Sequence, residues 1–114
     1  MANFAKENCR IVGAHLTTTA NTDVFAATGY TQIIDIRCAN ITGTDATITV
    51  NWYSVQQADQ FRLIYQHVVP ANGTITLPLE GFAPGAGDII RLQAGTANAI
   101  DVVMTLTEVP GRMI

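Results

Sequence analysis

Few side chains in the chain could carry nucleophilic or metal chemistry: His15, His67, Cys9, Cys38 and Ser54. A metal site needs three or four converging ligands, and no His-x-x-x-His or Cys-x-x-Cys spacing occurs. A serine nucleophile needs a neighbouring base, and Ser54 lacks the Gly-x-Ser-x-Gly turn that presents such a serine. No local signature joins either cysteine to a histidine. We therefore predict a protein that is not an enzyme and has no catalytic residues, metal ligands or cofactor.

A pair of carboxylates could instead serve glycoside hydrolysis. Many acidic residues fall in predicted turns or on polar strand faces, where solvated side chains are the expectation: Asp45, Asp59, Glu80, Asp88 and Asp101. A sheet face that combined Asp35 and Asp101 with the rings of Tyr53 and Tyr65 could bind a sugar. A carbohydrate-binding module therefore stays open as an alternative function.

Neither phosphate nor nucleic acid is an expected ligand. The net charge is −3, and the basic residues are scattered singly along the chain: Lys6, Arg10, Arg37, Arg62, Arg91 and Arg112. A nucleic-acid footprint would cluster such residues and interleave them with aromatic side chains. The glycine-rich stretch 81–88 lacks the Lys-Ser/Thr ending of a phosphate loop, and it leads into a predicted strand instead of a helix.

Alternation of apolar and polar residues with a period of two dominates the chain. Residues 46–53 place apolar side chains at every second position, which predicts a strand with one buried face. Similar or more continuous apolar patterns predict further strands at 10–17, 22–27, 34–38, 60–69, 74–79, 90–94 and 100–107. Ile34 and Ile36 are expected on the same buried face. Trp52, near the middle of the chain, is expected to anchor the core.

Short segments rich in Gly, Asn, Asp and Pro separate these strands, and no apolar stripe of helical period is present. Seven or eight short strands with frequent turns predict an all-β fold, an antiparallel β-sandwich of the jelly-roll or immunoglobulin-like type. The predicted organisation is an N-terminal arm at 1–9, a sandwich domain at 10–109 and a C-terminal tail at 110–114.

The two ends lack alternation but contain apolar residues, which makes Phe4, Cys9, Met113 and Ile114 candidates for contact with a partner. The N-terminus has no apolar segment typical of a secretion signal, and no apolar run is long enough to span a membrane. We therefore expect folding in a cytoplasm, where cysteines begin as thiols. Cys38 is expected in the core. A Cys9–Cys38 disulfide and a cross-link to another subunit both stay open.

The composition favours a surface that neighbouring proteins cover. Charged residues make up 13% of the chain, about half of the roughly 25% usual for soluble domains, while 48% of the residues are hydrophobic. A lone soluble monomer usually carries more charge, because charge opposes association.

The order of these elements resembles that of small virion proteins of tailed bacteriophages. Residues 33–50 match their apolar strand, Asn, short Gly-containing turn and alternating Ala-Thr-Ile-Thr-Val strand. Residues 69–74 are similar to their Pro-Ala turn, and residues 84–92 to their Gly-Asp entry into a late strand. Residues 99–109 resemble their closing strand, so the resemblance covers roughly residues 24–109.

This resemblance implies a β-sandwich that decorates or connects parts of a phage particle and that has no catalytic residues. The expected function is capsid decoration through the major capsid protein or other virion subunits, as a homo-oligomer, after assembly in the host bacterial cytoplasm. A neck or tail component is the alternative within the same resemblance, which does not place the protein on the particle.

Overall fold

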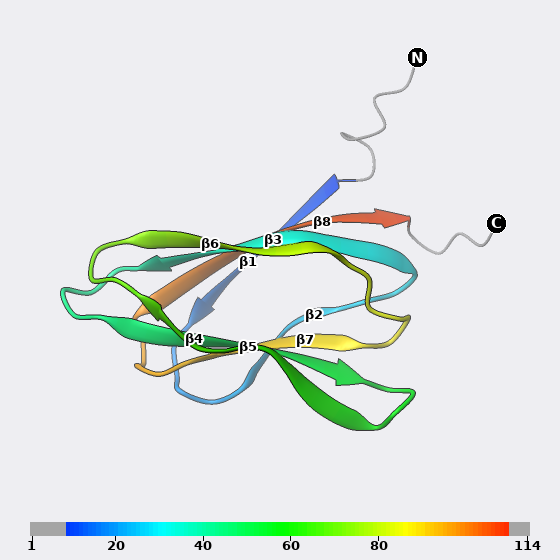
Figure 1. The fold of residues 1–114 in the computed structure, drawn as a ribbon, viewed down its shortest axis with the longest axis horizontal. Coiled ribbons are helices and arrows are strands. Elements are labelled where there is room, and N and C mark those ends of the chain that lie inside the picture. Colours follow the sequence, from blue (N-terminus) through cyan, green and yellow to red (C-terminus); the bar gives the residue numbers. More distant parts are fainter. Residues whose placement is uncertain (1–8, 110–114) are drawn as a thin grey trace, which may run out of the picture.

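The computed structural model describes residues 9–109, which form eight strands and no helix (Figure 1). The strands are β1 (Cys9–Leu16), β2 (Thr22–Ala26), β3 (Tyr30–Asn40), β4 (Ala46–Ser54), β5 (Asp59–Val69), β6 (Thr74–Phe82), β7 (Ile89–Ala94) and β8 (Ile100–Val109). They make two four-stranded antiparallel sheets, ordered β1-β8-β3-β6 and β2-β7-β4-β5. The predicted all-β sandwich is confirmed. The predicted tail and all of the predicted arm except Cys9 lie outside the described residues.

The pairing of the strands identifies the sandwich as a jelly roll. The first strand pairs with the eighth, the second with the seventh, the third with the sixth and the fourth with the fifth. This is the pattern of one long antiparallel hairpin rolled up on itself, and the β3–β8 and β4–β7 pairs complete the two sheets. An immunoglobulin-like fold would instead place the first two strands side by side in one sheet.

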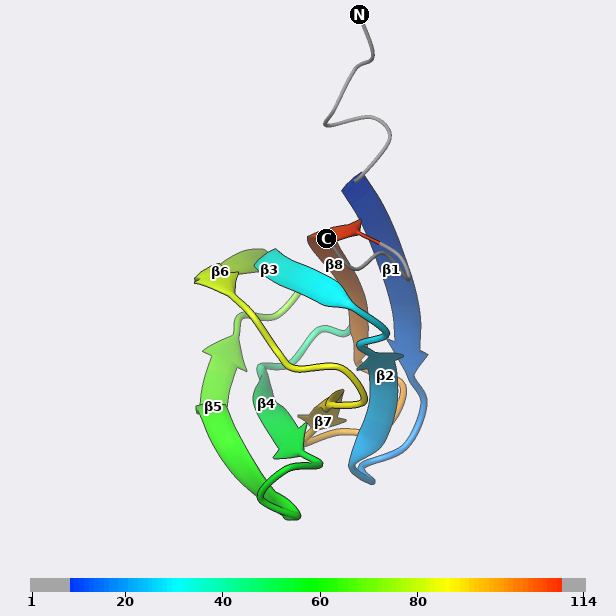
Figure 2. The same cartoon turned by 90° about the vertical axis from the view of Figure 1, so that its right-hand side faces the viewer.

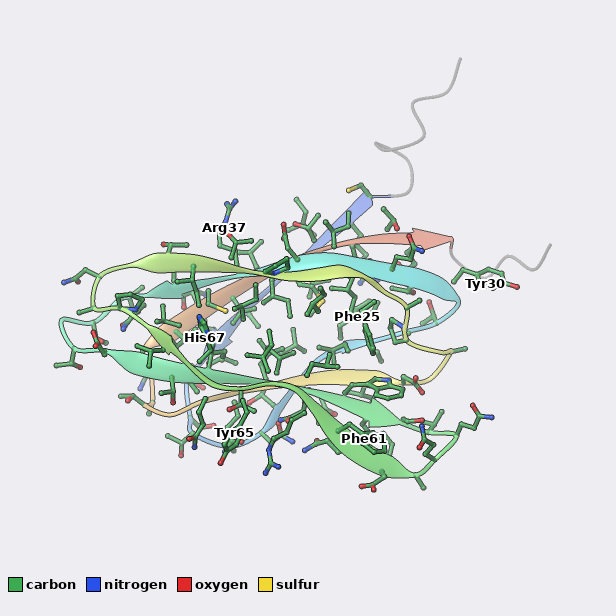
Figure 3. The ribbon with its side chains drawn as sticks, in the orientation of Figure 1. Phe25, Tyr30, Arg37, Phe61, Tyr65 and His67 are labelled. Atoms are coloured by element: carbon green, nitrogen blue, oxygen red, sulfur yellow. The ribbon has the colours of Figure 1, made fainter. Side chains whose placement is uncertain are left out.

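The two sheets face each other (Figure 2), and the core lies between them. Alternate residues of each strand point inward, and the central strands β3, β4, β7 and β8 supply many of the fully buried side chains. These include Ile33, Ile36, Ile48, Val50, Ile90, Leu92, Val102, Met104 and Leu106. Phe25 lies between the sheets (Figure 3). The edge strand β6 contains Pro78, a position where a missing N–H donor is tolerated.

An irregularity in β3 changes which face its residues occupy. Strand register with both neighbours shifts between Ile33 and Asp35, which is the mark of a β-bulge. Ile33 is therefore fully buried, and Ile34 is 42% exposed. Ile36 and Cys38 return to the core. The expectation that Ile34 shares the buried face of Ile36 is wrong, because the bulge inserts one residue between them.

Trp52 lies at the border of the core, where its ring is half-buried. It stacks at a tilt on Phe61 and meets the edge of Phe82, with ring centroids 5.5 Å apart in both pairs. Phe82 can reach it because β6 continues through Gly81, which adopts a positive φ of 79°. The predicted turn at 81–88 therefore begins two residues later, after Phe82.

Candidate functional site

The structure places one of the predicted partner-contact residues. Cys9 begins β1 and is exposed, so it belongs to a strand and not to the predicted arm. It lies opposite Thr107 in β8. Phe4, Met113 and Ile114 lie outside the described residues. The start of β1 and the end of β8 lie at the same end of one sheet (Figure 1).

Neither cysteine is bridged in the described structure. Cys38 is fully buried, and its burial raises the pKa of the thiol to about 12. Cys9 is on the surface. The Cys9–Cys38 disulfide left open by the sequence is therefore not formed in this fold.

This difference predicts selective thiol labelling. The folded protein should react with one equivalent of a thiol reagent at pH 8, because the reactive thiolate of Cys38 is scarce and covered. Guanidinium unfolding should expose a second equivalent. Two equivalents in the folded state would contradict the buried position of Cys38. No reaction in the folded state would indicate that Cys9 is cross-linked to another subunit.

The two histidines lie on different sheets. His15 on β1 makes a 2.7 Å hydrogen bond to Asp101, its direct neighbour on β8, while His67 lies on β5. The hydrogen bond and then the negative charge of Asp101 raise the pKa of His15 above its usual value. Ser54 accepts a hydrogen bond from the Gln57 backbone in the turn after β4. Among the described residues, no three His, Cys, Asp or Glu side chains are placed to hold one metal ion.

The outer surface of β1 and β8 carries an uncharged patch. Three directly opposed residue pairs form it, and we call it the β1/β8 patch: Cys9 with Thr107, Ile11 with Thr105, and Gly13 with Val103. Ile11 is 69% exposed and Val103 is 39% exposed. Gly13 has no side chain to cover Val103, so the apolar surface of Val103 stays open on that side.

Charged groups border the β1/β8 patch instead of entering it. Arg37 of β3 pairs with Val103 on its other side and points away from the core (Figure 3). Asp35 of β3 pairs with Thr105, and the His15–Asp101 pair closes the far end of the two strands. An uncharged centre with a polar rim is the usual anatomy of a protein interface.

The outer surface of the other sheet carries an open polar groove of about 260 Å³, which we call the β4/β5 groove. Its lining is rich in hydroxyl and amide groups: Thr47, Thr49, Asn51, Gln60, Arg62, Tyr65, Gln66, Gln93 and Gly95. The guanidinium of Arg62 lies 4.7 Å from the ring centre of Tyr65, whose side chain points away from the core (Figure 3).

The expectation that one sheet face combines two aspartates and two tyrosines into a sugar-binding site is wrong. Asp35 and Asp101 lie in the β1-β8-β3-β6 sheet, whereas Tyr53 and Tyr65 lie in the β2-β7-β4-β5 sheet. The two carboxylates and the two rings therefore cannot meet on one surface. The two tyrosines lie instead on a face that also carries amide and arginine side chains, such as Gln60 and Arg91. Sequence spacing did not predict this grouping, because Gln60 and Arg91 belong to different strands.

Asp88 is not a solvated turn residue, contrary to expectation. It is 4% exposed, and its carboxylate accepts hydrogen bonds from Trp52 Nε1 at 2.9 Å, the Val55 N–H at 3.0 Å and the Gly85 N–H at 2.8 Å. Its backbone oxygen accepts from the Ala27 N–H. Burial alone would raise the pKa of Asp88, but the bonds from Trp52, Val55 and Gly85 outweigh it and lower the pKa. Asp88 therefore joins three loops at one end of the sandwich.

Comparison with protein-family models and with curated protein sequences gives no match for this chain. No helix in residues 9–109 is long and apolar enough to cross a membrane.

Proposed function

We propose that this protein is a non-enzymatic structural subunit of a tailed-bacteriophage particle, a decoration protein that binds the major capsid protein. The observation that carries the proposal is the uncharged β1/β8 patch, with Ile11 69% exposed at its centre. The order of strands and turns, which resembles that of phage virion proteins, supports the same role.

Leaving the apolar surface of the β1/β8 patch in water costs free energy. Apolar area gains about 25 cal/mol for each Å² that a partner covers. A sheet surface whose residues have short side chains or none, such as Thr105, Thr107 and Gly13, lets a partner approach closely without displacing long chains. Interfaces of about 800 Å² per partner, repeated by the symmetry of a capsid, are sufficient for stable attachment.

The separation of the reactive side chains also supports a non-enzymatic role. His15 pairs with Asp101 on one surface, Cys38 is in the core, and Ser54 bonds within a turn. An acyl-transfer or hydrolytic site would need a nucleophile, a base and an orienting group within hydrogen-bond reach of one another.

Replacing Val103 with lysine tests the docking surface. Val103→Lys should leave the domain folded, because the side chain is already 39% exposed, and should weaken particle binding at least tenfold. The reason is that a lysine ammonium covered by an apolar interface loses its hydration, and 1.4 kcal/mol suffices for a tenfold change. Binding is measured by co-sedimentation with purified capsids that lack the protein.

The matched control is Val68→Lys, which changes another exposed valine, 50% exposed, on β5 of the opposite sheet. Circular dichroism and thermal unfolding of both variants check the fold. Equal capsid occupancy by wild type and Val103→Lys would refute the assignment of this surface. The copy number per particle tests the location: a value that scales with the number of capsid subunits supports decoration, and one ring of copies at a single vertex contradicts it.

A further inference from the structure

A chain of hydrogen bonds sets the orientation of Asn51 on the outer surface of β4. Arg91 donates from Nε to Asp23 at 2.7 Å and from a terminal nitrogen to Gln60 Oε1 at 3.3 Å. A guanidinium can only donate, so the group of Gln60 that it meets must be the oxygen. Asn21 Nδ2 also donates to this oxygen, at 2.8 Å. Since Asn21 Nδ2 is used in this way, Asn21 Oδ1 is the atom that faces Asn51. Asn51 Nδ2 donates a hydrogen bond to Asn21 Oδ1 at 3.0 Å.

The consequence is that Asn51 Oδ1 points away from Asn21 and has no hydrogen-bond partner among the described residues. Asn51 is 2% exposed, and its Oδ1 is a buried side-chain oxygen without a hydrogen bond among the described residues. Buried polar atoms in folded proteins almost always have a partner, so an exception points to a missing one. Asn51 lines the β4/β5 groove. The oxygen itself has almost no accessible surface, so a donor in the groove would supply the missing hydrogen bond only after a lining side chain moves aside.

The chemistry of the groove narrows the class of ligand. An unpartnered carbonyl oxygen needs an O–H or N–H group, which a fully ionised phosphate, a carboxylate or a hydrocarbon does not provide. The lining offers further hydroxyl and amide groups from Thr47, Gln66 and Gln93, and Arg62 is its one formal charge. These groups both donate and accept, as a polyhydroxylated neutral ligand requires.

An aromatic ring at the groove adds a second requirement that a sugar meets. Tyr65 is 60% exposed and lines the groove, and the Arg62 guanidinium lies 4.7 Å from the centre of its ring. The C–H face of a pyranose is apolar and packs on such a ring, while its hydroxyls reach side-chain amides. The groove volume of about 260 Å³ is near the lower limit of small-molecule pockets, roughly 300 Å³, and suits one or two rings.

We propose that the β4/β5 groove binds a neutral oligosaccharide, with one hydroxyl or acetamido N–H donating to Asn51 Oδ1 and one sugar face packed on Tyr65. The groove and the β1/β8 patch lie on different sheets. Docking through one therefore leaves the other free, and this proposal does not depend on the role in a phage particle.

The experiment begins with the wild-type protein on an array of neutral oligosaccharides: glucans, galactans, mannans and N-acetylglucosamine oligomers. The strongest binder is then titrated by calorimetry and by NMR. Tyr65→Ala should weaken binding at least tenfold. The matched control, Tyr30→Ala, removes a ring of similar exposure, 56%, from β3 of the other sheet and should leave the affinity unchanged.

NMR of the unmutated protein tests the carbonyl directly. Saturation with the sugar should move the side-chain ¹³Cγ resonance of Asn51 downfield, as a new hydrogen bond to Oδ1 requires. Failure of every neutral glycan to bind would overturn the proposal, as would full affinity in Tyr65→Ala or an unmoved Asn51 resonance. Binding of an extended polar peptide in the groove, in place of any glycan, would also overturn it.

Discussion

Replacing Asp88 with alanine should lower the free energy of unfolding by about 3–5 kcal/mol, a large part of the 5–15 kcal/mol typical of a domain. The substitution removes one side chain but leaves three N–H donors without an acceptor, those of Trp52, Val55 and Gly85. A fully buried donor left unsatisfied costs about 1–3 kcal/mol, and these three donors are part-buried, so each contributes towards the lower end of that range. Urea unfolding at pH 7 measures the change.

The same carboxylate predicts a pH dependence with a defined sign. Hydrogen bonding holds the pKa of Asp88 below its usual value, so the unfolded chain binds this proton more readily than the folded protein. The stabilisation is fully present above the unfolded pKa, about 3.9, and is lost as the pH falls through the lower pKa of the folded state.

Asp88→Asn removes the negative charge of the side chain and keeps nearly the same shape, so it separates the effect of charge from that of shape. The amide keeps one acceptor and has no pKa in this range, so this variant should be less stable than wild type at pH 7, and the difference should shrink towards pH 3. Two results would contradict the structural account of Asp88: a stability gap that stays constant with pH, or a loss below 1 kcal/mol in Asp88→Ala.

Replacing Ile36 with alanine should lower the free energy of unfolding by about 3 kcal/mol, whereas Ile34→Ala should lower it by only about 1 kcal/mol. Both isoleucines lie on β3, two residues apart. Ile36 is fully buried, so its truncation leaves a cavity in the core, and Ile34 is 42% exposed. Chemical denaturation of the two variants with a common slope measures the difference.

The pair tests the bulge as well as the core. Without a bulge, two isoleucines at this spacing would face the same side of the sheet, and their truncation would have similar effects. Similar losses in both variants would therefore show that β3 runs without the register shift between Ile33 and Asp35. A clearly larger loss in Ile36→Ala is the expected result.

The strands themselves were predictable from local pattern. The alternation at 46–53 and 100–107 predicted β4 and β8 to within two residues at each end, and a short segment separates β5 from β6 where the strands predicted at 60–69 and 74–79 left one. Alternation depends on which face of one strand meets water, and turns depend on backbone angles of a few adjacent residues. Neither property requires knowledge of the partner strand.

Other features depended on residues far apart in the chain. The sequence around Ile34 does not indicate a bulge, because the position of the bulge depends on how β3 pairs with β6 and β8. Asp88 has the local context of a surface turn, but its carboxylate accepts a hydrogen bond from Trp52, 36 residues away. The orientation of the Asn51 amide, which leaves Oδ1 without a hydrogen-bond partner, likewise depends on Asn21, 30 residues away.

The all-β class and the positions of its strands thus follow from patterns that a few neighbouring residues carry. Three features could be recognised only in the folded chain: the pairing of the strands into a jelly roll, the β1/β8 patch and the β4/β5 groove. The physical reason is that an exposed face is shared by strands from distant parts of the sequence, so the groups that meet on it cannot be recognised before the sheets form.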